Sequence, residues 1–128
     1  MNELTGPYME RAESALESAD ILYQNEQFLA LANRAYYAVF YCVSALLSTQ
    51  GVHTKKHQAA RAKFGELFVN TGLFTVDASK IVGHAFNARQ SADYDTETQI
   101  SDEQAQILLA DSQTFYDLTV AYLNKSQP

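Results

Sequence analysis

Apolar residues recur along the chain at helical spacing and predict five helical segments. These run from about Pro7 to Asn25, Phe28 to Gln50, Gln58 to Asn70, Asp77 to Tyr94 and Ser101 to Asn124. The two prolines stand at positions 7 and 128, so the residue that most often interrupts helices is absent between them. The sequence therefore predicts an all-α fold.

The second segment carries the broadest apolar surface. One stripe is formed by Leu29, Ala32, Tyr36, Phe40, Val43 and Leu47, and the adjacent stripe by Phe28, Leu31, Ala35, Val39, Cys42 and Leu46. A helix that is apolar on most sides must be covered by neighbours on most sides. We predict that this is the central and most buried helix of the bundle, and that Gly51 follows its end.

The sequence also indicates where the fourth and fifth helices begin, and which residues of the fifth helix face the core. Asp77 is the predicted N-cap of the fourth helix, and the run from Ser101 to Gln104 has the spacing of a capping box for the fifth. Four residues of the fifth helix are predicted to face the core: Leu108, Phe115, Leu118 and Tyr122.

Composition narrows the class of protein. A chain of 128 residues with 47% hydrophobic residues predicts one domain, residues 1–128. A single cysteine excludes an internal disulfide framework and a cysteine-based zinc cluster, and we expect neither a metal site nor a cofactor. The longest strongly apolar stretch, Tyr36 to Leu47, is too short to cross a membrane, and no signal peptide is visible. We expect a cytoplasmic protein without a membrane partner.

Charge is distributed unevenly around a net value of -6. The region 52–92 is basic, whereas the regions before and after it are acidic. It contains all three histidines and six of the nine Lys and Arg residues, namely Lys55, Lys56, Arg61, Lys63, Lys80 and Arg89. Such a region can attract a phosphate locally, or pair with an acidic neighbour.

Three groups of residues are candidates for chemistry. Arg89 and Asp93 stand four residues apart on one helix face, where they form either a solvated ion pair or a partly buried phosphate site. Arg34 lies within the most apolar helix, so we expect it to be more than half buried and to pair with a carboxylate, with Asp93 as the leading candidate. That pair could be purely structural, and the neighbouring aromatic residues are either core or a stacking surface.

The third group is the segment from Gly51 to His57. It carries Lys56 and His57, which could contact phosphate or simply face solvent. No metal site is expected from His53 and His57, because Gly51 argues against the helix that would align them.

Five runs together carry a family resemblance: NRAYYAVFY, GVHTKKH, KFGELFVNTGL, ARQSADYD and ISDEQAQILLADSQTFYDLTVAYL. This arrangement resembles the HEPN domain (higher eukaryotes and prokaryotes nucleotide-binding), in its small stand-alone prokaryotic branch with an Arg-x-x-Ala-Asp-Tyr signature. The resemblance extends from Met9 to Leu123. It implies an up-and-down bundle of four long helices with a shorter one, and a homodimer with its cleft between the protomers.

Many HEPN domains are metal-independent ribonucleases that use an arginine followed by a histidine. Arg89 matches the arginine, but Tyr94, Asp95 and Thr96 occupy the positions where the histidine is expected. A non-catalytic module that binds a nucleotide or RNA is therefore our first hypothesis. In prokaryotes, the resemblance further implies a minimal nucleotidyltransferase partner in a toxin–antitoxin or defence pair.

The first hypothesis assigns a role to several residues. Arg89 would hold phosphate, Asp93 would orient Arg34 or Arg89, Tyr94 would donate a hydrogen bond, and a wider ligand site would include Tyr37, Lys56 and His57. The alternative is a HEPN ribonuclease that uses Arg89 with a displaced histidine, His57 or His84. Because His84 precedes Arg89 by five residues, the two point to different sides of a helix, which disfavours His84.

Overall fold

The computed structural model describes residues 2–126 and is all-helical in that range. Its α-helices are α1 (Gly6–Gln24), α2 (Phe28–Ser48), α3 (His57–Phe64), α4 (Val76–Tyr94) and α5 (Asp102–Ser126), and a π-helical turn, η1 (Gly65–Val69), continues α3. No strand occurs among residues 2–126. The predicted fold class, four long helices with a shorter one, is confirmed. No helix in this range is long and apolar enough to cross a membrane.

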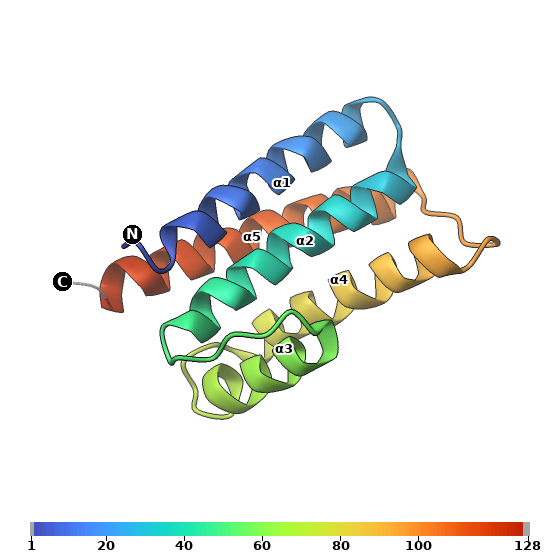
Figure 1. The fold of residues 1–128 in the computed structure, drawn as a ribbon. Coiled ribbons are helices and arrows are strands. Elements are labelled where there is room, and N and C mark those ends of the chain that lie inside the picture. The colour runs from blue at the N-terminus through green and yellow to red at the C-terminus, as the bar shows by residue number, and fades with distance from the viewer. Residues whose placement is uncertain (1, 127–128) are drawn as a thin grey trace.

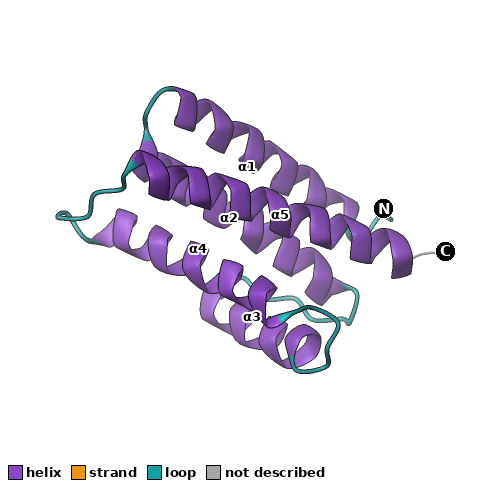
Figure 2. Cartoon of the chain, turned by 180° about the vertical axis from the view of Figure 1, so that it is seen from behind, coloured by secondary structure: helices purple, strands orange, loops and turns teal. Residues whose placement is uncertain are grey.

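The four long helices run alternately up and down, with short α3 at one end. Figure 1 shows α1 and α5 on one side of α2 and α4 on the other, with α3 beside α4. The view from behind in Figure 2 has the same arrangement, with both chain ends at one end of the bundle. The N-terminal hairpin of α1 and α2 is therefore covered by helices that come later in the chain.

Helix α2 is the centre of the bundle, as predicted. It packs against α1, α3, α4 and α5, and its buried residues extend from Leu31 to Ser48, without a break from Cys42 onward. Small residues such as Ala35 and Ala38 have no exposed surface, which lets neighbouring helices approach closely. Leu29 departs from the predicted stripe, because it lies in the first turn and 46% of it is exposed.

An aromatic cluster fills the end of the bundle where α3 and η1 meet α5. Phe64, Phe68 and Phe115 are at most 1% exposed, and the ring of Phe64 lies 5.6 Å from that of Phe115 and 5.5 Å from that of Phe74. These rings fill the interior at this level. Leu118, one turn beyond Phe115, is therefore left at the edge and is 42% exposed, so its predicted core position is wrong.

The helix ends match the predictions in part. The capping box of α5 is confirmed, because the Ser101 N–H donates to Gln104 Oε1 and the Gln104 N–H donates to Ser101 Oγ. The cap of α4 is Thr75 instead of Asp77: its Oγ1 accepts the Ala78 N–H at 3.1 Å, and Asp77 already lies in the first turn. The third helix is also less regular than predicted, since it passes into η1 after Phe64.

Candidate functional site

Three aromatic side chains of α2 form one surface of the candidate site. Tyr36 and Tyr37 are adjacent in the helix and Phe40 lies one turn further on, and the His57 ring packs on all three. Its centroid is 5.2 Å from that of Tyr36, 5.7 Å from that of Tyr37 and 4.5 Å from that of Phe40. His57 is the first residue of α3 and follows the extended residue Lys56, so the start of this helix places the imidazole against α2.

Arg89 enters the same region from α4. Its Cζ lies 5.6 Å from the ring centroid of Tyr36, 5.9 Å from that of Tyr37 and 5.6 Å from that of Tyr94. Only 15% of its side chain is accessible. A guanidinium placed over ring faces is attracted by their negative potential, which fixes its plane. We refer to Tyr36, Tyr37, His57, Arg89 and Asp93 as the Arg89 cluster.

Arg89 and Asp93 form the predicted pair within α4. The Nε atom of Arg89 lies 2.8 Å from Oδ2 of Asp93, whose side chain is 28% accessible. The Nε–H bond is not aligned with this oxygen, so the contact is an ion pair without a hydrogen bond, and no other acceptor among residues 2–126 reaches the buried Nε–H. The guanidinium has five N–H donors, and one carboxylate satisfies few of them.

Arg34 pairs with no carboxylate of residues 2–126, and the prediction that Asp93 is its partner is wrong. It is partly buried, as expected, but its Nε and Nη2 donate to Oδ1 of the adjacent Asn33, at 3.2 and 3.0 Å. Its Cζ also lies 5.1 Å from the ring centroid of Tyr37. The Asn33 amide donates to Asp93 Oδ2 at 3.4 Å, so Asn33 stands between Arg34 and the carboxylate that Arg89 already holds. Asp93 thus orients Arg89 directly and Arg34 only through an amide.

Two predicted site residues lie at the margin. Tyr94 is 72% exposed, with its ring against Arg89. Lys56 is the N-cap residue of α3, next to His57, and its side chain is exposed with no partner among the described residues. The structure therefore brings Arg89, Asp93, Tyr94, Tyr37 and His57 together, connects Arg34 through Asn33, and leaves Lys56 in solvent.

The surroundings of the Arg89 cluster shift the pKa values of His57 and Tyr36. Burial lowers the pKa of His57 from its ordinary value of 6.5, and the positive charge of Arg89 lowers it further. Burial raises the pKa of Tyr36 well above its ordinary value, although the charges of Arg89 and Arg61 act in the opposite direction. His57 is therefore mostly neutral at pH 7, with one ring nitrogen able to accept a proton.

His84 lies on another side of α4, as its spacing from Arg89 predicts. It is exposed and lines a hollow of about 540 Å³ between α4 and α5, together with Asn87, Ser91 and Leu108. The Arg89 cluster lies where α4 faces α2 and α3. His57, and not His84, is thus the histidine that shares contacts with Arg89.

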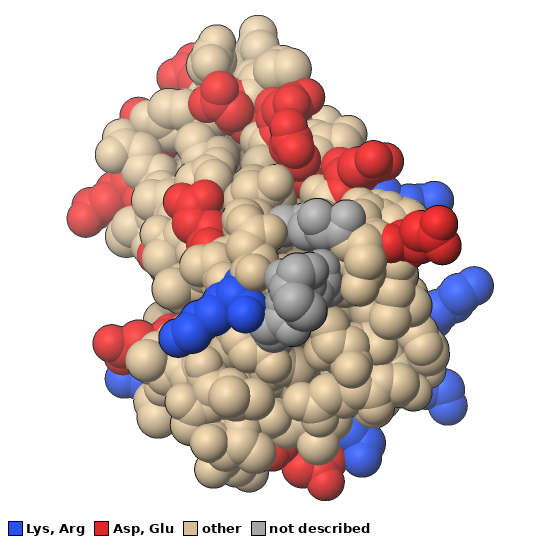
Figure 3. Space-filling model, turned by 90° about the vertical axis from the view of Figure 1, so that its left-hand side faces the viewer, with Lys and Arg blue, Asp and Glu red and all other residues tan. Residues whose placement is uncertain are grey.

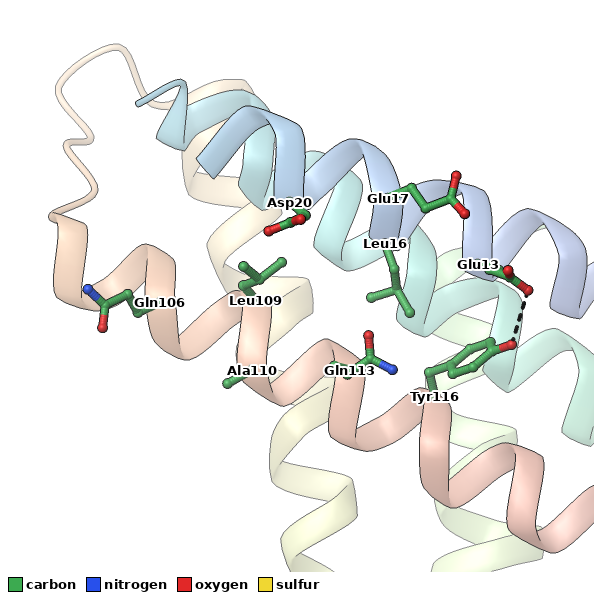
Figure 4. A pocket seen from close by; sticks show the side chains of 9 residues that line it. All are labelled: Glu13, Leu16, Glu17, Asp20, Gln106, Leu109, Ala110, Gln113 and Tyr116. Atoms are coloured by element: carbon green, nitrogen blue, oxygen red, sulfur yellow. Dashed lines mark hydrogen bonds between the residues drawn. The ribbon is translucent and has the colours of Figure 1, made fainter. Parts of the chain in front are cut away.

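A second hollow is acidic. The groove between α1 and α5 has a volume of about 610 Å³, and Figure 4 shows Glu13, Glu17 and Asp20 along its α1 side. In Figure 3, which views the end where both termini lie, acidic side chains gather mainly in the upper half, and most basic ones lie lower. Phosphate is repelled from the acidic groove, so the Arg89 cluster is the better anion site.

A sequence model of the HEPN domain matches residues 7–123. The chain belongs to the HEPN family. It is 37% identical to "Putative toxin MJ0142" of Methanocaldococcus jannaschii over 115 residues, and the aligned region covers 90% of this chain and 78% of that protein. A second protein of that organism, "Putative toxin MJ0605", is 35% identical over 85% of this chain and 81% of its own length. A "UPF0332 protein" of Thermotoga maritima is 34% identical over 84% of this chain and 81% of its own.

Sequence reasoning missed three residues around this HEPN site. Asn33 stands between Arg34 and Asp93, Tyr36 supports both Arg89 and His57, and Arg61 reaches α4 from α3. Arg61 follows His57 by four residues, and this spacing places both side chains on one face of a helix. That signal was present in the sequence. Among residues 2–126, no group of three or more His, Cys, Asp and Glu side chains is placed to hold a metal ion.

Proposed function

We propose that this HEPN protein binds RNA or a nucleotide through a phosphate at the Arg89 cluster, and that binding does not depend on cleavage. The proposal rests on the burial and the hydrogen bonding of the Arg89 side chain. Its side chain is only 15% accessible and is held by ring faces and, at Nε, by Asp93, whereas its two Nη groups donate no hydrogen bond to another described residue. A guanidinium fixed in this way, with donors left over, is suited to bidentate contact with phosphate.

Tyr94 would contribute a base contact next to that phosphate. Its ring is largely exposed and lies beside the Arg89 guanidinium. An exposed ring beside a phosphate-binding arginine can stack on a base, a contact that tolerates any base identity. This supports a ligand that carries both a phosphate and a base.

A metal-independent ribonuclease is the second candidate, because His57 shares two ring contacts with Arg89. Both side chains lie against Tyr36 and Tyr37. A neutral imidazole can accept a proton from a ribose 2′-hydroxyl while the arginine stabilises charge on the phosphate. The imidazole comes from α3 instead of the end of α4, so His57 would replace the histidine that this chain lacks after Arg89.

The proposed binding site also involves a second copy of the chain. We propose a two-fold dimer that brings two Arg89 clusters to one cleft, since Leu29 and Tyr94 are large exposed side chains and Tyr94 lies against Arg89. Two facing guanidinium groups repel each other, and an anion between them relieves this repulsion. Light scattering at micromolar concentration tests the dimer: a species of 14.3 kDa would contradict it.

The biological setting is proposed from relatives. Two similar proteins carry the word toxin in their names, and we propose that this chain works with a minimal nucleotidyltransferase in a toxin–antitoxin or defence pair. The acidic face of α1 would be free for a protein partner while the Arg89 cluster holds RNA. Co-expression with the product of a neighbouring nucleotidyltransferase gene tests the pairing.

Binding is tested with a labelled six-nucleotide single-stranded RNA, measured by fluorescence anisotropy. Arg89→Ala should weaken binding by about tenfold or more, the effect of losing one charged hydrogen-bonding contact. Lys80→Ala removes a positive charge from an exposed position on the same helix and should bind within about twofold of wild type. Equal affinity for wild type and Arg89→Ala would remove Arg89 from the site.

The same samples separate the two candidate functions. Gel analysis of the RNA after incubation reports cleavage. If wild type leaves the RNA intact, the ribonuclease is excluded for that substrate and the binding module stands. If wild type cuts the RNA and His57→Gln binds it without cutting, His57 is the proton carrier and the second candidate replaces the first.

A further inference from the structure

Arg61 extends from α3 to α4 and lies close to Gly83. A Cβ atom added to Gly83 would lie 2.9 Å from Nη2 of Arg61 and 3.6 Å from its Cζ. Gly83 is buried within α4, where its φ angle is not unusual. The absence of a side chain at position 83 thus provides the space for the guanidinium.

A glycine in the interior of a helix is unfavourable. It destabilises a helix by roughly 0.5–1 kcal/mol relative to alanine, because the unfolded chain loses more freedom on folding. Neither a turn nor a close backbone approach requires Gly83, and the guanidinium of Arg61 is what occupies the space above it. The chain therefore has a helix-weakening residue at a position where the missing side chain lets an arginine lie close to α4.

Arg61 has no acidic partner among the described residues. The ion pairs there are Lys63 with Glu66 and Arg89 with Asp93. The Arg61 Cζ lies 5.3 Å from the ring centroid of Phe86, and the side chain remains exposed. An exposed guanidinium held against a ring, with its donors free, is available to a ligand.

Arg61 and Arg89 lie on either side of one pair of aromatic rings. Phe86, under Arg61, packs edge to face on Tyr36 with centroids 6.0 Å apart, and Tyr36 in turn lies under Arg89. Both charges act on the hydroxyl of Tyr36, lowering its pKa against the effect of burial. The two arginines therefore belong to one electropositive surface on α2, α3 and α4.

The two guanidinium groups contact different parts of α4. Gly83 and Arg89 are six residues apart, about 9 Å along the helix axis. The Arg89 guanidinium is directed at Asp93 and Tyr94, beyond Arg89 in the chain, whereas that of Arg61 stays at Gly83 and Phe86. Such a separation fits two phosphates of one strand, with His57 and Tyr36 between them.

We propose that Arg61, in the space left by Gly83, is a second phosphate contact, and that the ligand is a single-stranded RNA of at least three nucleotides, not a mononucleotide. This inference rests on the proposed RNA or nucleotide binding at Arg89. It also specifies the path of the RNA: the strand lies along α4, from the Arg61 end to the Tyr94 end. A single nucleotide would engage only Arg89.

Two variants test Arg61 by different routes. Gly83→Ala keeps every charge but displaces the guanidinium, and Arg61→Gln removes the charge. The displaced atoms are the far end of a flexible side chain, and alanine favours the helix, so the thermal midpoint of Gly83→Ala should equal or exceed that of wild type. Lys63→Gln is the control, since Lys63 is an exposed cation on α3 whose side chain is 49% accessible.

Affinity is measured for adenosine 5′-monophosphate and for a six-nucleotide RNA. Gly83→Ala and Arg61→Gln should each weaken binding of the RNA by about tenfold and leave binding of the mononucleotide unchanged. The slope of log affinity against log salt should fall by about 0.7 in Arg61→Gln, which is the value for one phosphate contact on a single strand. Lys63→Gln should bind both ligands within about twofold of wild type. A merely structural Arg61 would change stability without changing the slope or the dependence on length.

Failure of this inference is distinguishable from failure of the proposed function. If Arg89→Ala weakens RNA binding while Gly83→Ala and Arg61→Gln bind as wild type does, Arg61 is not a phosphate contact and the Arg89 site stands. If Arg61→Gln weakens the mononucleotide and the RNA equally, both arginines hold one phosphate and the two-phosphate site is wrong. If wild type binds neither ligand, the proposed function fails and the inference fails with it.

Discussion

The Nε atom of Arg89 lies 2.8 Å from Oδ2 of Asp93, one turn along the same helix, and this ion pair is far less accessible than the Lys63–Glu66 pair. In the first pair the side chains are 15% and 28% accessible, and in the second 49% and 57%. Solvent screens the exposed pair, whereas removing Asp93 leaves a mostly buried guanidinium without its counter-charge. The two ion pairs therefore allow a direct comparison between a mostly buried pair and an exposed one.

Asp93→Asn should lower the free energy of unfolding by about 1–2 kcal/mol, between the values typical of exposed and of fully buried pairs. Glu66→Gln, which breaks the exposed pair, should lower it by less than about 0.5 kcal/mol. Urea denaturation at pH 7 measures both. Equal values for the two variants would mean that Asp93 does not compensate the charge of Arg89.

His57 should make the stability of the protein depend on pH. Its pKa is below 6.5 in the folded state, through burial and then the charge of Arg89, so the unfolded chain takes up the proton more readily. The stability associated with neutral His57 is therefore present above pH 6.5 and is lost as the pH falls toward the lower folded pKa.

The comparison uses His57→Phe, which keeps a ring against Tyr36 and Phe40 but cannot titrate. Between pH 7.5 and pH 5.5, wild type should lose more stability than His57→Phe in urea denaturation. The same exchange at exposed His53 controls for the removal of an imidazole. A variant that loses as much stability as wild type would show that His57 does not titrate in this way.

Tyr94 should act through its ring and not through its hydroxyl. Tyr94→Ala removes a largely exposed ring beside Arg89 and should weaken RNA binding by about tenfold, near the lower end for a base–aromatic stack. Tyr94→Phe keeps the ring and should bind within about twofold of wild type. Anisotropy titration measures both. If Tyr94→Phe is as weak as Tyr94→Ala, the hydroxyl makes the contact, which is the hydrogen-bond role assigned from the sequence.

Two residues of α5 should differ sharply in their contribution to stability. Phe115 is fully buried among aromatic rings, and Phe115→Ala should lower the free energy of unfolding by about 3–5 kcal/mol, because a cavity remains. Leu118 is 42% exposed, and Leu118→Ala should lower it by less than about 1 kcal/mol. Urea denaturation measures both. A large loss for Leu118→Ala would return that residue to the core.

The helices could be predicted because their signals are local. Apolar spacing and the lack of internal proline indicated the bundle, the double stripe of α2 indicated its central position, and the Ser101–Gln104 spacing indicated the start of α5. Thr75 was missed as a cap because Asp77 is the more favourable N-cap by residue type, and only the backbone angles show that Thr75 takes this place.

Side-chain contacts within one helix could be predicted, but those between helices could be predicted only in part. Arg89 and Asp93 lie on one helix, so their spacing in the sequence was enough to predict the ion pair. Arg34 and Asp93 lie on two helices, and their relation depends on Asn33, which the pattern gave no reason to place between them. Leu118 was misplaced because apolar periodicity does not say how much of the core Phe64, Phe74 and Phe115 already fill.

The central position of α2 also bears on how the chain reaches its fold during synthesis. The ribosome completes α2 early, and α1 covers only part of it. The helices that cover the rest, α3, α4 and α5, are made later. At ordinary elongation rates this interval is on the order of ten seconds. The nascent α1–α2 hairpin therefore presents an apolar surface before its native neighbours exist, which is the kind of surface that chaperones bind.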